Sequence, residues 1–278
     1  MPAPVTKGLA DGLERLGLAG HAHHLYERIR AFSLRSELQS ADDLPLPPRW
    51  SRMAVAGTPD ASWFLESGRK TARMIADTFA RHGQPIEEVG DLLDFGCGCG
   101  RVVRHWRALS ATSVHGTDFN ARLISWCTKN LTFADFSKNE LAPPLRLAED
   151  RFDAAYAFSV FTHLPEELTL EWLAELSRVL RPGGLLVVST HGEAYADRLS
   201  HEERERFLSG EAVIHRSRVA GTNLCTAFHP ANYVRARFTR DFELLEHTPA
   251  AVGARVRDHD LAVLRKPETA TPGRGSGS

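Results

Sequence analysis

The sequence has few cysteines and no long apolar run. Its four cysteines are Cys97, Cys99, Cys127 and Cys225, and their sparse, uneven spacing offers no disulfide framework. No segment of 18 apolar residues occurs, and the N-terminus lacks the basic stretch and apolar run of a signal peptide. These absences argue against a disulfide-stapled protein and against a membrane-spanning one. We therefore expect a soluble cytoplasmic protein.

The sequence also lacks an excess of charge of either sign. Lysine and arginine together number 34, aspartate and glutamate 35, so the formal net charge is -1. Such a balance gives no bulk attraction to nucleic acid or to an anionic membrane, and we expect neither as a partner. The 278 residues, of which 42% are hydrophobic, are enough to bury a substantial core.

Strand-like and helix-like segments alternate between residues 89 and 190. The apolar patterns predict strands at 89–95, 112–118, 152–161 and 185–190, and helices at 101–109, 121–131 and 165–180. Two more strand-like runs, 242–250 and 260–267, would form a closing antiparallel pair. This order predicts a doubly wound α/β fold whose mostly parallel sheet is covered by helices on both faces.

Weaker patterns flank the alternating region. Three prolines in LPLPPRW, residues 44–50, cannot lie inside a helix, so the N-terminal segment is read as helical and then irregular. We expect an N-terminal lid at 1–65, the core at 66–190, a cap insertion at 191–240, closing strands at 241–267, and a disordered tail at 268–278.

Three glycines follow the first predicted strand, in DFGCGCGRVVRHW at residues 94–106. They lie at the carboxyl end of that strand, where open α/β sheets bind ligands. A backbone without side chains lets a ligand approach closely, and the N–H groups of the next helix favour a negative group. A zinc site is poorly supported, because Cys97 and Cys99 have no second Cys or His pair at zinc spacing. We expect no metal.

Two carboxylates indicate the kind of ligand. Asp94 precedes the glycines and would repel a pyrophosphate, but it suits a ligand with an ammonium group. Asp118 ends the second predicted strand and is placed to accept hydrogen bonds from two ribose hydroxyls. A ligand with a ribose, an amino-acid end and no pyrophosphate is S-adenosylmethionine. A nicotinamide-dependent oxidoreductase is the less favoured alternative, since the loop reads GxGxG rather than GxGxxG.

Four segments, in order, resemble motifs of the class I S-adenosylmethionine-dependent methyltransferases. LLDFGCGCGR resembles motif I, GTDFN the acidic end of motif II, FDAAYAFSVFTHL motif IV with its following loop, and LRPGGLLVVS motif VI. The resemblance implies a Rossmann-like sheet of seven strands, one of them antiparallel, and S-adenosylmethionine as cofactor. It covers residues 89–190 well, and residues 1–50 and 191–240 only by position.

The same resemblance implies roles for individual residues. The candidates are Asp94, Gly96, Cys97 and Gly98 for the methionine end, Asp118 for the ribose, Phe119, Asn139, Glu140 and Leu141 for the adenine, and Phe158 and Ser159 near the sulfonium. The 137–144 stretch, SKNELAPP, departs from the family pattern because it lacks the usual aspartate.

A methyltransferase with these motifs would act on an oxygen or nitrogen of a small-molecule or metabolite-like acceptor. Such an acceptor loses a proton, and histidine has the best-matched pKa near neutrality. His163, after the fourth strand, and His191, after the fifth, are the candidate bases, while His215 and His229 lie in the weakly patterned region. Catalysis without a side-chain base stays open.

Two further questions also stay open in the sequence. A non-catalytic S-adenosylmethionine-binding regulator or scaffold would carry the same binding motifs, because binding motifs do not prove turnover. The protein would be a monomer or a homodimer. Methylation of DNA bases is set aside, because SVFT, residues 159–162, replaces the PP-aromatic tetrapeptide found in enzymes that methylate base amines.

Overall fold

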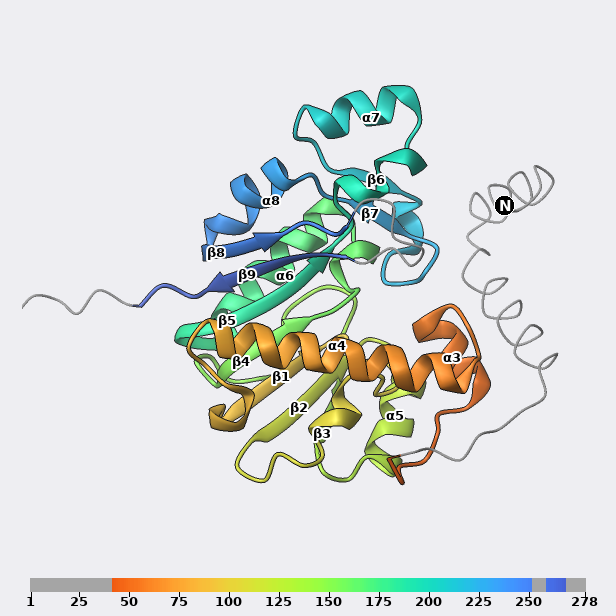
Figure 1. Ribbon diagram of the computed structural model, residues 1–278, viewed down its shortest axis with the longest axis vertical. Helices are drawn as coiled ribbons and strands as arrows, with labels where there is room; N and C mark the ends of the chain where they lie inside the picture. The colour runs from red at the N-terminus through yellow and green to blue at the C-terminus, as the bar shows by residue number, and fades with distance from the viewer. Residues whose placement is uncertain (1–41, 252–258, 269–278) are drawn as a thin grey trace, which may run out of the picture.

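The computed structural model describes residues 42–251 and 259–268 and centres on a seven-stranded sheet (Figure 1). The strand order is β3-β2-β1-β4-β5-β9-β8. The strands are β1 (Asp91–Phe95), β2 (Ser113–Asp118), β3 (Asp135–Lys138), β4 (Phe152–Ala157), β5 (Leu180–Thr190), β8 (Glu243–Thr248) and β9 (Asp260–Arg265). Only β9 runs antiparallel to its neighbours. This confirms the Rossmann-like, doubly wound sheet of seven strands with one antiparallel strand.

Helices cover both faces of this sheet. The α-helices of the described ranges are α3 (Arg49–Ala56), α4 (Ala61–Arg81), α5 (Ala121–Asn130), α6 (Glu166–Val179), α7 (His201–Leu208) and α8 (Ala231–Arg237), of which α4, α5, α6 and α8 pack against the sheet. The alternating side chains of β4 contact two separate cores: Ala155 and Ala157 pack with residues of α6 and α8, whereas Ala154 and Tyr156 pack with residues of α4 and α5. Because successive side chains of β4 point to opposite faces of the sheet, this one central strand contributes to both cores.

The helix expected at 101–109 is wrong. The structure has a short 3-10 helix there, η2 (Val103–Trp106). Gly100 has φ +80°, so the turn of the glycine loop extends as far as this residue. The long helix α4 also passes close by, because a Cβ on Gly68 would lie 2.1 Å from the carbonyl oxygen of Arg101. Helix α4 therefore packs directly against the start of this segment.

The segment between β5 and β8, called the cap below, contains seven short elements. In chain order they are η4 (Glu193–Arg198), α7, β6 (Val213–His215), η5 (Ser217–Val219), β7 (Thr226–Phe228), α8 and η6 (Phe238–Arg240), and β6 and β7 form an antiparallel pair. Figure 1 shows α7, β6 and β7 together beyond one end of the sheet. The cap meets the N-terminal segment where the Asn223 side-chain amide donates to the Ala54 carbonyl, 2.5 Å away. The division into lid, core and cap stays a prediction, and residues 1–41, 252–258 and 269–278 lie outside the described parts.

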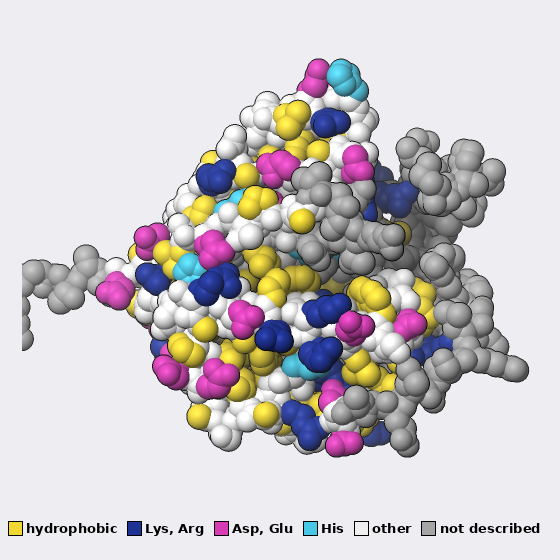
Figure 2. Space-filling model, viewed as in Figure 1, with side chains coloured by type: hydrophobic (Ala, Val, Ile, Leu, Met, Phe, Trp, Pro, Cys, Tyr) yellow, Lys and Arg dark blue, Asp and Glu magenta, His cyan; other side chains and the backbone are white. Residues whose placement is uncertain are grey.

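The surface carries charges of both signs. Figure 2 shows lysine and arginine side chains interspersed with aspartate and glutamate on one face of the molecule. No helix in the described ranges is long and apolar enough to cross a membrane.

Candidate functional site

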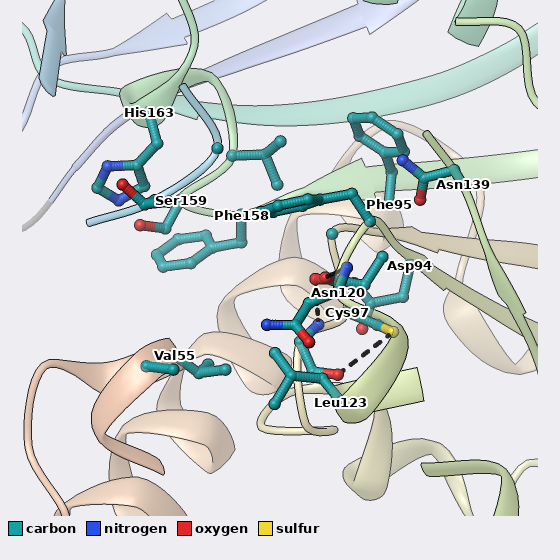
Figure 3. A pocket seen from close by; sticks show the side chains of 18 of the residues that line it. Val55, Asp94, Phe95, Cys97, Asn120, Leu123, Asn139, Phe158, Ser159 and His163 are labelled. Carbon is teal, nitrogen blue, oxygen red and sulfur yellow. Dashed lines mark hydrogen bonds between the residues drawn. The ribbon is translucent and has the colours of Figure 1, made fainter. Parts of the chain in front are cut away.

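A pocket lies at the carboxyl ends of β1, β2, β3 and β4 (Figure 3). All the predicted cofactor-binding residues line it: Asp94, Gly96, Cys97, Gly98, Asp118, Phe119, Asn139, Glu140, Leu141, Phe158 and Ser159. Among the candidate bases, His163 also lines the pocket, whereas His191, His215 and His229 are not among the lining residues. The structure therefore brings together residues that the sequence spreads over the ends of four strands, β1, β2, β3 and β4.

The glycine loop is bare for two reasons. Gly96 and Gly98 have φ angles of +78° and +57°, a backbone region that favours glycine. Side chains also crowd both positions: a Cβ on Gly96 would lie 2.3 Å from Val160 Cγ2, and one on Gly98 would lie 2.7 Å from Val55 Cγ2. The loop is thus enclosed by the segment after β4 on one side and by α3 on the other.

Asp94 is a buried carboxylate with an unsatisfied oxygen. Its side chain is 3% exposed, and Oδ2 has no hydrogen-bond partner. Burial raises the pKa of Asp94 to about 7, a shift that the Tyr156 hydroxyl and the Arg101 guanidinium oppose. A buried carboxylate oxygen without a partner is costly unless a cation or a hydrogen-bond donor meets it. The position suits an ammonium group.

The Asp118 carboxylate is held rigidly by the backbone. Oδ2 accepts from the Gly98 N–H at 3.0 Å, and Oδ1 accepts from the Asn120 N–H at 2.8 Å. Burial raises the pKa of Asp118 to about 6, against the effect of these two hydrogen bonds. Each carboxylate oxygen keeps a further lone pair, so the group can still accept from two neighbouring hydroxyls.

The segment that follows β3 adds both polar and apolar side chains to the pocket. A Cβ on Gly221 would lie 2.9 Å from Leu141 Cδ1 and 3.1 Å from Phe119 Cε1, so these two side chains border the same glycine of the cap. Glu140 is exposed and pairs with Lys138 at 2.7 Å. The Asn139 side-chain amide donates to the Glu140 carbonyl, also at 2.7 Å.

The end of β4 is held in an unusual conformation. Ser159 has φ +62°, which is uncommon for a residue other than glycine and often marks a functional site. Its N–H donates to Ser189 Oγ at 2.7 Å, and this oxygen lies 3.0 Å from His259 Nδ1. The His259 ring in turn stacks on Phe158, with centroids 5.2 Å apart and an interplanar angle of 8°. Ser189 of β5 and His259, which directly precedes β9, thereby position the two predicted sulfonium-flanking residues.

His163 has one ring nitrogen committed to the cap. It ends the 3-10 helix η3 (Phe161–His163), and its Nδ1 lies 2.7 Å from the Cys225 carbonyl oxygen. Because a carbonyl only accepts, Nδ1 carries the hydrogen, and Nε2 of the neutral ring is an acceptor. Burial lowers the pKa of His163, although the bond to Cys225 opposes this. The ring is therefore neutral at pH 7, with Nε2 able to take a proton.

His191 packs behind the pocket wall. Its ring centroid lies 4.1 Å from that of Tyr195, 4.9 Å from His259 and 6.4 Å from His163. Burial lowers the pKa of His191 to about 2, and its Nδ1 has no hydrogen-bond partner.

The two histidines of the weakly patterned region, His215 and His229, differ in their surroundings. His229 is fully buried, and burial lowers its pKa to about 4. His215 pairs with Glu203 at 3.0 Å in the cap.

Several lining residues were not singled out by the sequence predictions. Among them are Ala54 and Val55 of α3, Arg101, Asn120, and Gly221, Thr222 and Asn223 of the cap. Asn120 had a local signal, because it directly follows the strand and caps α5 by accepting from the Arg122 N–H at 3.1 Å. The segments at 54–55 and 221–223 fall within the predicted lid and cap, but no local signal singled out these residues, since their position depends on long-range packing. In the described ranges, no group of three or more His, Cys, Asp or Glu side chains is arranged to hold a metal ion.

The chain matches a known family and a curated relative. The family described as a methyltransferase domain matches residues 67–235. A malonyl-[acyl-carrier protein] O-methyltransferase from Buchnera aphidicola subsp. Baizongia pistaciae is 32% identical over 113 residues, which are 37% of this chain and 41% of the relative. The matched segment thus spans less than half of that protein's length.

Solved structures share the fold at low identity. A S-adenosylmethionine-dependent methyltransferase from Methanosarcina mazei superimposes with a TM-score of 0.52 at 20% identity, over 68% of this chain and 98% of the other. The 1,6-didemethyltoxoflavin-N1-methyltransferase of Burkholderia thailandensis, solved with S-adenosylhomocysteine, gives a TM-score of 0.50 at 18% identity, over 75% of this chain and 82% of the other. The family match covers more than half of the chain. The chain therefore belongs to the class I methyltransferases, enzymes whose cofactor is S-adenosylmethionine.

Proposed function

We propose that this enzyme transfers the methyl group of S-adenosylmethionine to an oxygen or nitrogen of a small-molecule acceptor, with His163 as the general base. The orientation of His163 supports the proposal most strongly. Its Nδ1 is committed to the Cys225 carbonyl, 2.7 Å away, so Nε2 is the nitrogen that can accept a proton. The ring lies beside Ser159 and Phe158 on one wall of the pocket (Figure 3).

The other polar groups of the pocket suit the parts of the cofactor. The Asp94 carboxylate would meet the ammonium of the methionine end, and the neighbouring Arg101 would meet its carboxylate. Asp118 would accept from the two ribose hydroxyls, since its oxygens are already oriented by Gly98 and Asn120. Phe119 and the adjoining residues 139–141 would border the adenine. These assignments leave the wall formed by Ser159 and His163 for the transferred methyl group.

The chemistry asks for positioning and for proton removal. The cofactor, when bound, supplies a methyl group on a positively charged sulfur. The pocket would hold the acceptor in line with that methyl group, and Nε2 of His163 would take the acceptor's proton as the new bond forms. The partial burial of the pocket lowers the local dielectric constant, which strengthens the polar interactions inside it.

The curated relative suggests a different acceptor. That protein is a malonyl-[acyl-carrier protein] O-methyltransferase, whose name gives a malonyl group on an acyl carrier protein as the acceptor. A carboxyl oxygen of this kind is a second candidate acceptor. A cytoplasmic location, and a monomeric or homodimeric state, stay predictions from the sequence.

A turnover experiment tests the proposal. The protein would be incubated with S-adenosylmethionine and a panel of hydroxyl, amine and carboxyl compounds, and S-adenosylhomocysteine and methylated products would be measured by mass spectrometry. We expect product with at least one acceptor and much less with His163→Gln. His201→Gln is the matched control, because that histidine is exposed on α7. Binding of S-adenosylhomocysteine without turnover of any acceptor would instead favour the non-catalytic regulator.

A further inference from the structure

Tyr156 is a buried tyrosine beside Asp94 in the middle of the sheet. Asp94 of β1 and Tyr156 of β4 are partners in the parallel register, so their side chains leave the sheet on the same face. Leu92, two residues before Asp94, packs with Tyr156 in the core on that face. The Tyr156 side chain has no exposed surface. A phenol and a carboxylate are thus enclosed together at the methionine end of the pocket.

The hydroxyl of Tyr156 has a defined direction. Its oxygen accepts from the Trp106 Nε1–H at 2.8 Å, and the hydroxyl forms a side-chain hydrogen bond with Asp94. The indole nitrogen only donates, so the proton of the phenol is the one available to the carboxylate. A series of donors therefore runs from Trp106 through Tyr156 to Asp94.

The charge of Asp94 depends on its neighbours. The titratable and charged groups that face it in the described ranges are Tyr156 from β4, Asp118 from β2, and Cys97 and Arg101 from the glycine loop and its end. Burial raises the pKa of Asp94 to about 7, and the charge of Asp118 adds to the rise. The Tyr156 hydrogen bond is the largest opposing effect, ahead of the Arg101 guanidinium. Burial keeps the Cys97 thiol neutral, because it raises the pKa of that thiol well above its usual range.

We propose that Tyr156 is a positioning residue for the cofactor, whose hydroxyl, fixed by Trp106, orients the Asp94 carboxylate so that Oδ2 meets the ammonium of the methionine end. This rests on the proposed function, in which Asp94 binds that ammonium. Oδ2 has no hydrogen-bond partner within the protein, which leaves it for a ligand. A hydrogen bond donated to a carboxylate also stabilises its ionised form, and the ionised form is the one that pairs with a cation.

The cap contains a matched tyrosine. Tyr233 is also buried, and its hydroxyl donates to Glu166 Oε1 at 3.1 Å. Neither of these two residues is among those that line the pocket. Tyr233→Phe and Tyr156→Phe therefore each remove one hydrogen bond from a phenol to a carboxylate, but only the second carboxylate would touch the cofactor.

Calorimetry between pH 6 and pH 8.5 tests the proposal with two ligands. S-adenosylhomocysteine has the amino-acid end, whereas 5′-methylthioadenosine keeps the ribose and adenine but lacks that end. In the wild type we expect the affinity for S-adenosylhomocysteine to rise about tenfold from pH 6 to pH 8, as Asp94 ionises. Tyr156→Phe should move this rise upward by about one pH unit or more, and so weaken binding at pH 7 at least about fivefold. Its affinity for 5′-methylthioadenosine should stay within about twofold, and Tyr233→Phe should change neither ligand's binding.

A double-mutant cycle shows whether Tyr156 acts through Asp94. Asp94→Asn removes the charge, so the binding of S-adenosylhomocysteine should lose most of its rise with pH. Adding Tyr156→Phe to Asp94→Asn should then weaken binding less than about twofold, because no carboxylate is left to orient or ionise. Trp106→Phe, which keeps the Tyr156 hydroxyl but removes the group that fixes it, should give a smaller shift in the same direction as Tyr156→Phe.

The opposing outcomes separate the positioning role from the proposed function. An unshifted pH profile in Tyr156→Phe, an equal loss of affinity for both ligands, or a full loss in the Asp94→Asn background would overturn the role of Tyr156 and leave methyl transfer standing. If Tyr156→Phe does not fold, an unshifted profile in Trp106→Phe overturns it instead. A wild-type protein that binds no S-adenosylhomocysteine at any of these pH values would overturn the proposed function as well.

Discussion

Nδ1 of His163 lies 2.7 Å from the carbonyl oxygen of Cys225. His163 belongs to the loop after β4, whereas Cys225 belongs to the cap, 62 residues further along the chain. The backbone strengthens the same connection, because the Gly221 N–H donates to the His163 carbonyl at 2.8 Å. The cap therefore sets the tautomer of the proposed base and also borders the pocket, so cap closure and catalytic competence are expected to be coupled.

Removing the proposed base should affect turnover far more than binding. We expect His163→Gln to lower kcat by about 10²–10⁴-fold, because glutamine cannot take the acceptor's proton. The affinity for S-adenosylhomocysteine should stay within about twofold. Steady-state kinetics and calorimetry check the two parts, and a near wild-type kcat across pH 6 to 9 would show that His163 is not the base.

The pH dependence of kcat should follow the neutral form of His163. Burial lowers the pKa of this ring below its ordinary 6.5, and a base works only when unprotonated. We therefore expect kcat to rise with pH on a limb whose midpoint lies below 6.5 and to be flat above it. A midpoint clearly above 7 would mean that another group, or a protonated His163, controls the rate.

Cofactor affinity should depend on Asp118. Asp118→Ala removes the carboxylate that the Gly98 and Asn120 N–H groups orient, and we expect a loss of about 1.5–3 kcal/mol of binding free energy. Asp135→Ala is the control, because that carboxylate is exposed on β3. Titration of S-adenosylhomocysteine measures both, and equal affinity in the two variants would exclude Asp118 as the ribose ligand.

Two glycines with similar φ angles allow the cost of backbone strain to be distinguished from the cost of side-chain crowding. Gly57 has φ +67° with nothing within 4 Å of its added Cβ, whereas Gly98 has φ +57° and meets Val55 at 2.7 Å. Gly57→Ala should cost about 1 kcal/mol of unfolding free energy, and Gly98→Ala should cost more and also weaken cofactor binding. The added Val55→Ala change should recover part of the Gly98→Ala loss. Denaturant unfolding of the single and double variants checks this, and no recovery would refute the contact.

Acid sensitivity should arise in part from buried neutral histidines. The pKa of His229 is about 4 in the folded protein, against an ordinary 6.5, so between these values the unfolded chain binds more protons. The unfolding free energy therefore falls as the pH drops below 6.5. His229→Leu should reduce the loss of stability between pH 7 and pH 4 by about 1–3 kcal/mol relative to wild type.

Any effect of His229→Leu on packing that does not depend on pH cancels, because only the change in unfolding free energy between pH 7 and pH 4 is compared. His201→Leu serves as the control, because that ring is exposed. Denaturant titrations at several pH values measure the effect. Parallel pH profiles for wild type and His229→Leu would contradict it.

Local sequence predicted those parts of the pocket that lie at strand ends. Asp94 and Asp118 end or nearly end β1 and β2, and parallel strands in register bring their carboxyl ends to one edge. Val55 and Asn223 could not be found in this way, because they reach the pocket by the packing of remote segments. His191 does directly follow β5, but its ring packs on Tyr195, and strand order alone does not give the direction of a ring.

The account can be tested most directly by a crystal structure of the complex with S-adenosylhomocysteine. We expect the ribose hydroxyls on Asp118, the amino-acid end between Asp94 and Arg101, and the sulfur facing the wall formed by Ser159 and His163. A ligand bound in this pocket with its sulfur turned away from His163, or bound elsewhere in the protein, would contradict the proposed site.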